Sequence, residues 1–313
     1  MQSSQSLFRG SMMRWNAESF RRRFFASSSS GHKLKKFYKS VDIKSIDSTS
    51  PHYVPIFSSK SLQSSKEQEK NSNNNNSLSH SHSHTDSPRH IHGRNWTLLL
   101  DGKTFRTPKR TVFQVPSESL ALAIAGEWLI QGHAIEPSTM LLTTIGTSAI
   151  DLKREMPLKK DVDYLLSYLQ TDTVCYRAPF PEALSSDQER TFAPIIGHMR
   201  DAYRVKLLTT HGLGHLQHPE DGFKNMATVL SNMSFYERTA LEVAVTSARS
   251  FSIGMSLTDG FLNPDDAVRA SRLEEIHQSE QWGADESGHG VDASDLEIQM
   301  RSAWLFTHLL RME

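Results

Sequence analysis

Cysteine is almost absent from this chain of 313 residues, which contains only Cys175. A single cysteine excludes a disulfide within the chain and any metal site built from several thiolates, so we expect a buried role for Cys175. An excess of one charge is also lacking, because 35 lysines and arginines balance 35 aspartates and glutamates. We therefore expect no nucleic-acid partner. No apolar run reaches the roughly 20 residues that cross a bilayer, so we expect no stable membrane insertion.

Signatures of catalysis are missing as well. The chain has no glycine-rich phosphate loop, no HExxH, no GxSxG and no dinucleotide-binding fingerprint. The spacing of His211, His215 and His218 would suit a metal, but Gly212 and Gly214 argue against a helix that presents them together. We expect no catalytic residue, no cofactor and no metal site.

The first 30 residues are rich in arginine and serine and contain one acidic residue, Glu18. An arginine-rich, acid-poor segment with scattered apolar residues is typical of a mitochondrial presequence, with a plastid transit peptide as the main rival. We predict a presequence over residues 1–30 with cleavage near Ala26. The mature protein is then expected in the mitochondrial matrix, associated with the inner membrane at most peripherally.

Short apolar runs predict a small antiparallel sheet after this segment. Strands are expected at Lys36–Ile43 and Trp96–Leu100, and Asp101-Gly102 is a tight-turn signal before a strand at Lys103–Arg106. A further strand is expected at Thr111–Val115. The sheet therefore occupies the first part of the chain.

Residues 58–92 interrupt this part with a stretch rich in serine, asparagine and histidine. Such a composition buries too little apolar surface to fold, so we predict a disordered insertion in the loop between two paired strands. Its histidines would bind metal only adventitiously, and low-complexity drift is the preferred explanation.

A helix is expected from Ser117 to Gly132, with Trp128 as the large structural anchor that packs it on the sheet.

From residue 136 onward the apolar periodicity is helical. Helices are expected at Met140–Asp151, Asp161–Gln170, Gln188–Val205, Asn225–Leu230, Ser234–Leu257, Asn263–Gly283 and Ser294–Leu310. Capping boxes are expected at Ser234 with Glu237 and at Ser294 with Glu297. The chain is thus predicted to be α+β, with a small N-terminal antiparallel β-sheet subdomain (34–135) followed by a C-terminal multi-helical bundle (136–313).

The helix expected at Asn263–Gly283 has one face that mixes small apolar residues with polar ones and is too polar for ordinary core. Glu274 and Glu275 lie in its middle, with Arg272 close by. Such a face is either a solvated charged surface or a surface that binds a partner. The pattern alone leaves both interpretations open.

Six blocks in order resemble the mitochondrial F1-ATP synthase assembly chaperones that escort the alpha subunit. The blocks are FYK at Phe37–Lys39, LLDGKTFRTP at Leu99–Pro108, VPSESLALAIAGEW at Val115–Trp128, MLLTTIGTSAID at Met140–Asp151, LQTDTVCYR at Leu169–Arg177 and SRLEEIHQSEQWG at Ser271–Gly283. No single block is specific, but six in order cover roughly residues 34–310. The insertion at 58–92 departs from the pattern of that family.

The resemblance implies a binding protein and not an enzyme. Such a chaperone binds the free F1 alpha subunit and prevents its aggregation until beta replaces it. The family's critical acidic position matches Glu274 first and Glu275 second. The implied partner-binding residues are Glu274, Glu275, Arg272, Gln281 and Trp282.

An alternative from another class stays open at this point. It is a mitochondrial enzyme that acts on a small anionic substrate through Arg106, Lys109 and Arg110. A metal-handling protein built on the histidine tracts is a further possibility.

Overall fold

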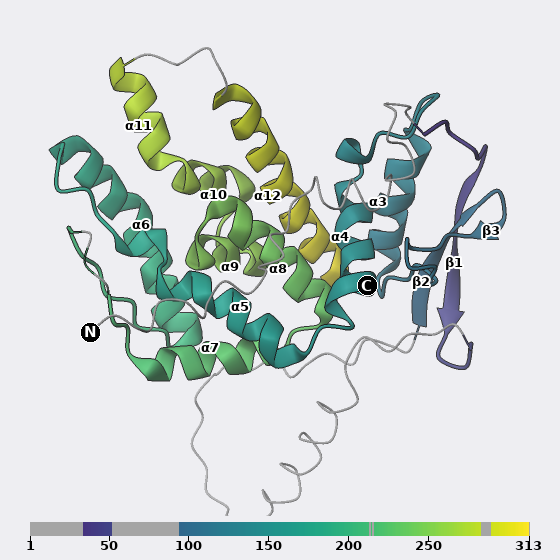
Figure 1. Ribbon diagram of the computed structural model, residues 1–313, viewed down its shortest axis with the longest axis horizontal. Coiled ribbons are helices and arrows are strands. Elements are labelled where there is room, and N and C mark those ends of the chain that lie inside the picture. Colours follow the sequence, from purple (N-terminus) through teal and green to yellow (C-terminus); the bar gives the residue numbers. More distant parts are fainter. Residues whose placement is uncertain (1–33, 52–93, 213, 215, 283–288, 313) are drawn as a thin grey trace, which may run out of the picture.

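The structure is a computed structural model that describes residues 34–51, 94–212, 214, 216–282 and 289–312. The predicted presequence, residues 1–30, and the predicted insertion, residues 58–92, lie outside the described residues. Figure 1 shows a small sheet with α3 and α4 beside it at one end of the molecule and the remaining helices at the other. The expected α+β architecture is confirmed.

The sheet has three antiparallel strands in the order β1-β2-β3. Their bounds are Val41–Asp47 for β1, Arg94–Leu100 for β2 and Lys103–Thr104 for β3. The predicted turn between β2 and β3 is confirmed, since Asp101 and Gly102 both have positive φ, at 49° and 74°. The Asp101 carboxylate also accepts the N–H groups of Ser40 and Lys39, each at 2.8 Å, and these bonds lower its pKa.

Two strand predictions need correction. The first strand begins at Val41 and not at Lys36. The stretch predicted as a strand at Thr111–Val115 makes only isolated bridges, among them Trp96 with Val115. A long-range contact explains the second difference, because the Gln114 carbonyl accepts the hydroxyl of Tyr236 from the helical part.

Helix α3, Glu118–Leu129, covers the sheet and begins as predicted, with the Ser117 hydroxyl accepting the Leu120 N–H. Its buried Trp128 ring packs against the rings of Phe105 and Tyr38, at centroid distances of 4.7 and 5.5 Å. The Tyr38 hydroxyl donates to the Trp128 carbonyl at 2.6 Å. Trp128 therefore lies between the sheet and α3.

Helices make up the rest of the described chain. Their bounds are Leu141–Ser148 (α4), Leu158–Gln170 (α5), Glu182–Tyr203 (α6), Glu220–Asn232 (α7), Phe235–Ala248 (α8), Phe251–Asp259 (α9), Pro264–Ser271 (α10), Leu273–Trp282 (α11) and His289–Arg311 (α12). A π-helical turn at Ala149–Lys153 continues α4. Helix α8 is central and packs on α9, α12 and α4.

One hydrophobic core contains buried residues from both sides of the boundary predicted at residues 135 and 136. The Ser117 hydroxyl donates to the carbonyls of Leu309 and Met312, which joins the start of α3 to the end of α12.

Cys175 is buried, as expected, and burial raises the pKa of its thiol to about 12. Within the described ranges no helix is long and apolar enough to cross a membrane.

The single helix predicted at Ser234–Leu257 is wrong, because the chain breaks at Arg249 and Ser250 into α8 and α9. Arg249 has a φ of 54°, and the Ser250 hydroxyl caps α9. The buried Asp172 carboxylate accepts the Ser250 and Ser252 hydroxyls and the Ser252 N–H, at 2.6 to 2.7 Å. A carboxylate is stable at the positive end of a helix, so this contact fixes the break.

The helix predicted at Asn263–Gly283 is also two helices, α10 and α11, with the break at Arg272. Asn263 caps the first of them as expected, accepting the Asp266 N–H at 2.9 Å. The last helix begins at His289, so the capping box predicted at Ser294 falls inside it. Glu297 instead pairs with Arg301, one turn further along α12, at 2.9 Å.

Candidate partner-binding site

Helix α11 carries four of the five residues predicted to bind a partner, and Arg272 directly precedes it. Glu274, Glu275 and Gln281 are exposed, and Trp282 is the last residue of α11. Figure 1 shows α11 at the end of the molecule opposite the sheet, next to α6, on which it packs. The structure thus brings these residues together on one exposed helix.

Glu274 is tied to the neighbouring helix. Its Oε1 accepts a hydrogen bond of 2.8 Å from Nε2 of Gln188, a fully buried residue on α6. Oε1 of the same Gln188 accepts the backbone N–H of Ala178 at 2.7 Å. One buried amide therefore joins the first turn of α11, the second turn of α6 and the loop before α6.

Glu275 has a different environment. Its carboxylate accepts the Arg272 Nε–H at 3.1 Å, and both side chains remain partly or largely exposed. An exposed ion pair of this kind contributes little to stability. Glu274 and Glu275 are neighbours in sequence, but of these two carboxylates it is Glu274 that bonds to another helix.

Sequence reasoning missed Arg177, which holds the loop before α6. Its buried guanidinium donates to the Val174 carbonyl, lies 3.3 Å from the Glu189 carboxylate and stands 5.0 Å from the centre of the Phe192 ring. It also missed Gln188, which had only marked the start of a predicted helix. No local signal identifies Gln188, because its partner Glu274 is 86 residues away in sequence.

A second polar contact fixes the other half of α6. Oδ2 of Asp259, the last residue of α9, lies 2.6 Å from Nε2 of His198 and accepts the Tyr203 hydroxyl at 2.5 Å. The Phe261 ring stacks on His198 at 4.1 Å. Burial and the nearby Asp259 raise the pKa of Tyr203, so its hydroxyl stays protonated and donates. This cluster joins α6 to α9.

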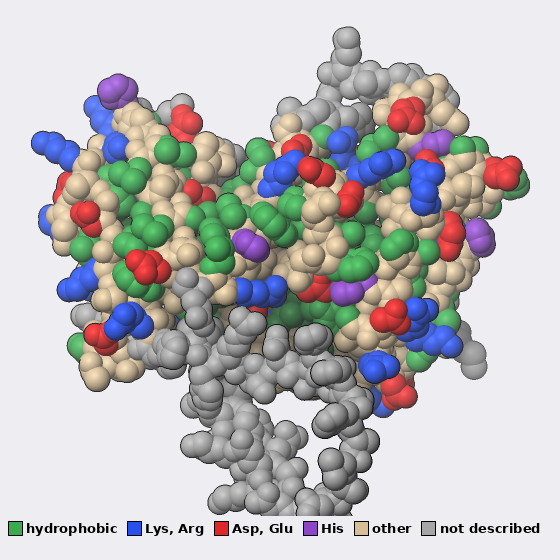
Figure 2. All heavy atoms as spheres, turned by 180° about the vertical axis from the view of Figure 1, so that it is seen from behind, with side chains coloured by type: hydrophobic (Ala, Val, Ile, Leu, Met, Phe, Trp, Pro, Cys, Tyr) green, Lys and Arg blue, Asp and Glu red, His purple; other side chains and the backbone are tan. Residues whose placement is uncertain are grey.

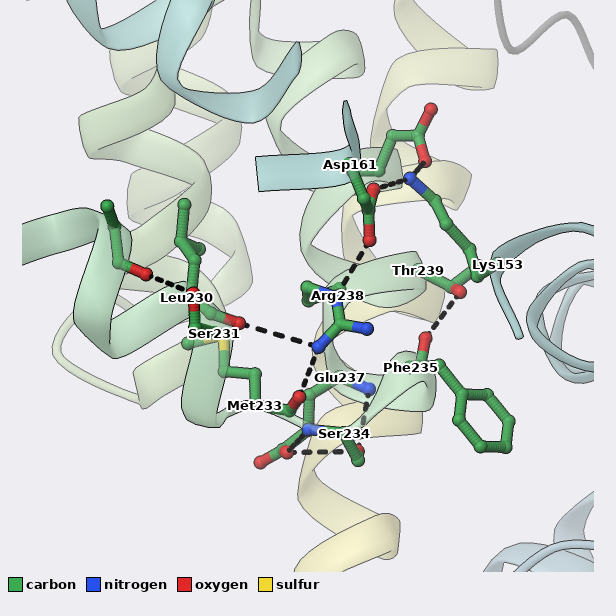
Figure 3. Close-up of polar contacts among 12 residues, drawn as sticks. Lys153, Asp161, Leu230, Ser231, Met233, Ser234, Phe235, Glu237, Arg238 and Thr239 are labelled. Atoms are coloured by element: carbon green, nitrogen blue, oxygen red, sulfur yellow. Dashed lines mark hydrogen bonds and ion pairs between the residues drawn. The ribbon is translucent and has the colours of Figure 1, made fainter. Parts of the chain in front are cut away.

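A buried ion cluster lies deeper in the helical part (Figure 3). Lys153 contacts the carboxylates of Asp161 and Glu242, and Asp161 also accepts the Arg238 Nε–H at 2.7 Å. Arg238 further donates to the carbonyls at the end of α7, those of Leu230 and Met233. Burial raises the pKa of Glu242, and the positive charge of Lys153 opposes that shift. All four charged side chains are closed off from solvent, so the cluster is structural.

The histidine tract within residues 58–92, on which the metal-handling alternative depends, lies outside the described residues. Within the described part of the chain, no group of three histidine, cysteine, aspartate or glutamate side chains is placed to hold a metal ion. His215 is outside the described residues. Of the predicted anion-binding residues, Lys109 pairs with Glu155 at 2.6 Å and Arg106 donates to the Arg110 carbonyl at 2.9 Å. Two of the three cations are therefore engaged within the protein.

Large apolar side chains are exposed at several places. Those at least half exposed among the described residues are Phe37, Leu122, Leu129, Ile130 and Phe180. Figure 2 shows hydrophobic side chains over both lobes of the molecule and a hollow between the lobes at the top of that view. Single exposed apolar residues are common on protein surfaces, so these positions do not by themselves define a binding site.

Comparisons with known proteins agree with this architecture. The sequence model of the family described as ATP12 chaperone protein matches residues 81–200. The chain is 25% identical over 223 residues to Protein atp12, mitochondrial, of Schizosaccharomyces pombe, covering 67% of this chain and 76% of that protein. It is 28% identical over 258 residues to Protein ATP12, mitochondrial, of Saccharomyces cerevisiae, covering 69% and 79%.

The fold is also that of a solved structure. The crystal structure of Atp12 from Paracoccus denitrificans superposes with a TM-score of 0.68 at 26% sequence identity, and the match covers 89% of this chain and 99% of that chain. The matching family model is described as a chaperone protein, which bears out the expectation that the chain is not an enzyme. The chain is thus similar to the ATP12 chaperone family over residues 81–200 and to two mitochondrial ATP12 proteins over about two thirds of its length.

Proposed function

We propose that this protein is a molecular chaperone for assembly of the mitochondrial F1 ATP synthase, which binds the free F1 alpha subunit and prevents its aggregation until beta replaces it. The observation that supports it most directly is the match to the Atp12 fold over 89% of the chain. The six sequence blocks that resemble the alpha-specific assembly chaperones support the choice of partner.

Transient binding to the exposed interface of the unassembled subunit is sufficient for this function. An unassembled subunit exposes an apolar interface that aggregates with other copies. A chaperone prevents this if it binds that interface more tightly than the subunit binds itself, and less tightly than the final partner does. The exposed apolar side chains of the present protein provide surface for such binding, and no nucleotide hydrolysis is needed.

The partner-binding residues proposed are Glu274, Glu275, Arg272, Gln281 and Trp282. Their place on α11 supports this assignment, since α11 lies at the edge of the molecule and packs chiefly on α6. Glu274 is exposed while its carboxylate is oriented by Gln188. An oriented, exposed carboxylate is suited to pair with a basic group of the partner.

A reconstitution experiment tests the choice of partner. The mature chain, residues 26–313, is immobilised and incubated with a mitochondrial lysate, and purified alpha and beta are then each heated with and without it. We expect the alpha subunit to be the dominant captured protein and alpha alone to be kept soluble. Capture of beta in preference to alpha, or no protection of alpha, would contradict the proposal.

The matrix is the proposed location, because residues 1–30 resemble a presequence and both fungal relatives are named mitochondrial. Residues 1–40 fused to a fluorescent protein should enter mitochondria and be cleaved near Ala26. A cytosolic or plastid signal would contradict this location.

A further inference from the structure

The segment that leads into α6 presents the most exposed of the large hydrophobic side chains that the structure describes. Phe180 is 82% exposed. Pro179 and Pro181 on either side of it are exposed as well, and so is Ala183 beyond the exposed Glu182. We call this segment, residues 178–183, the Phe180 tip. A single exposed hydrophobic residue is common on protein surfaces, so exposure alone assigns no role.

The backbone of the Phe180 tip is restricted on both sides of the aromatic residue. Proline fixes its own φ near −65° and also limits the residue before it, so Pro179 and Pro181 leave Phe180 few conformations. An exposed side chain that is already held in position loses less conformational entropy when it binds. The two prolines therefore restrict the backbone that carries the Phe180 ring before any partner binds.

The base of the tip is anchored in the core. Arg177, which precedes it, is buried and engages the Val174 carbonyl, Glu189 and the Phe192 ring. The N–H of Ala178 is held by Oε1 of the fully buried Gln188. These contacts fix the backbone that carries a fully solvated phenylalanine, although none of them buries the ring itself.

Gln188 also connects the tip to the predicted partner-binding residue. Its Oε1 holds Ala178 and its Nε2 donates to Glu274, so a single planar amide sets the distance between the tip and α11. Two carboxylates of α6 accompany the tip: Glu182 is an exposed residue of the tip itself, and Glu189, whose side chain is 67% exposed, lies 3.3 Å from Arg177 at its base. The exposed Phe180 side chain therefore has carboxylates close to it in the same segment and at the base of the tip.

We propose that Phe180 is an apolar anchor that inserts into a recess of the free F1 alpha subunit bordered by lysine or arginine, and that Gln188 is a positioning residue that holds Phe180 and Glu274 in one surface. This inference rests on the proposed function. Aromatic anchors in interfaces are residues whose truncation typically weakens binding most. Carboxylates around such an anchor favour a basic border on the partner.

Truncation of the ring tests the anchor. In the mature chain, Phe180→Ala should weaken binding to purified alpha on the order of tenfold or more. Phe37→Ala is the matched control, because Phe37 is 62% exposed in the sheet subdomain, and it should bind like the parent. If the parent binds alpha and Phe180→Ala binds equally well, the anchor role is overturned. If the parent itself does not bind alpha, the proposed function fails instead.

An exchange of two side chains tests the positioning role. Gln188→Glu keeps the acceptor for Ala178 but places a carboxylate against Glu274, so binding should weaken. Adding Glu274→Gln restores one hydrogen bond between the two positions, in which the amide at position 274 now donates to the carboxylate at position 188. We expect the double variant to bind alpha more tightly than Gln188→Glu alone, and about as tightly as Glu274→Gln alone, because both of these lack the Glu274 charge; all variants are checked for folding by circular dichroism. A folded double variant that binds as weakly as Gln188→Glu would overturn the role of Gln188.

Discussion

The buried ion cluster and the contact between α6 and α11 are both polar bridges between distant segments, but they differ in exposure. Lys153 and Asp161 are almost completely buried, and each contacts more than one oppositely charged group. Glu274 in contrast is exposed and receives one hydrogen bond from the buried Gln188. A desolvated charge that loses its partner destabilises the fold, whereas an exposed charge remains solvated and available to another protein.

The largest expected effect comes from breaking the buried cluster. Lys153→Met removes the cation that contacts Glu242 and Asp161, and it leaves buried carboxylates short of positive charge. Removing one partner of a buried pair costs about 3 to 5 kcal/mol of unfolding free energy. Guanidinium unfolding followed by circular dichroism measures the change.

A matched control is the exposed pair of Lys109 and Glu155. Lys109→Met removes the same charge from a solvated site, so it should change the free energy of unfolding by less than about 1 kcal/mol. Equal effects of Lys153→Met and Lys109→Met would show that burial does not distinguish the two pairs.

Charge reversal at the exposed bridge is expected to act on binding. Glu274→Lys replaces one good helix former by another, so the helix itself changes by tenths of a kcal/mol, and the lost hydrogen bond to Gln188 adds about 1 kcal/mol. If Glu274 pairs with a basic group of alpha, like charges then face each other and binding weakens by about 2 to 5 kcal/mol.

The measurements for Glu274→Lys are thermal unfolding and suppression of alpha aggregation. We expect a folded protein that no longer protects alpha. Unfolding of the variant would make Glu274 a scaffold residue, and full protection would make it part of a solvated face.

The comparison also explains which features the sequence could predict. Helix starts at Ser117, Ser234 and Asn263 were predicted correctly because a cap involves residues within one turn. The breaks at Arg249 and Arg272 were not, because long-range packing overrides a continuous helical pattern. In the first case the buried Asp172, 78 residues before Ser250 in sequence, holds the new helix start.

The candidate site was predictable only in part. The RLEE segment pointed to Glu274 through its resemblance to a family, and its exposure on α11 was consistent with the mixed polar face. Gln188 and the ion pair between Asp161 and Arg238 carry no such signal, since glutamine and paired charges occur throughout helical sequences. Their partners become visible only when the helices are packed.

Glu127 on α3 is a third kind of carboxylate, because it is partly buried and pairs with no cation among the described residues. It accepts the N–H groups of Leu142 and Thr143 and the Thr143 hydroxyl, each at 2.7 Å, at the start of α4. Burial raises its pKa to about 7, although these hydrogen bonds oppose the shift. The ordinary pKa of glutamate, about 4.3, describes the unfolded chain.

The sign of the resulting pH dependence follows from proton binding. Between pH of about 4.3 and 7 the folded protein binds more protons at Glu127 than the unfolded chain does. The contribution of Glu127 to stability is therefore full below a pH of about 4.3 and is lost as the pH rises through about 7, by about 4 kcal/mol at most. The difference in unfolding free energy between the parent and Glu127→Gln, measured from pH 5 to 8, should show this slope. Parallel pH profiles would contradict it.

The smallest expected effect is at Glu275, the neighbour of Glu274. Its carboxylate is already paired with Arg272 at 3.1 Å and makes no contact with Gln188, so Glu275→Lys should change stability by less than about 1 kcal/mol. Because Arg272 offsets its charge before any partner arrives, the reversal should also weaken alpha binding less than Glu274→Lys does. Titration of both variants against purified alpha under the same salt conditions measures the difference. A larger loss for Glu275→Lys than for Glu274→Lys would move the partner-binding carboxylate one residue along α11 and would separate the alpha contact from the bridge to α6.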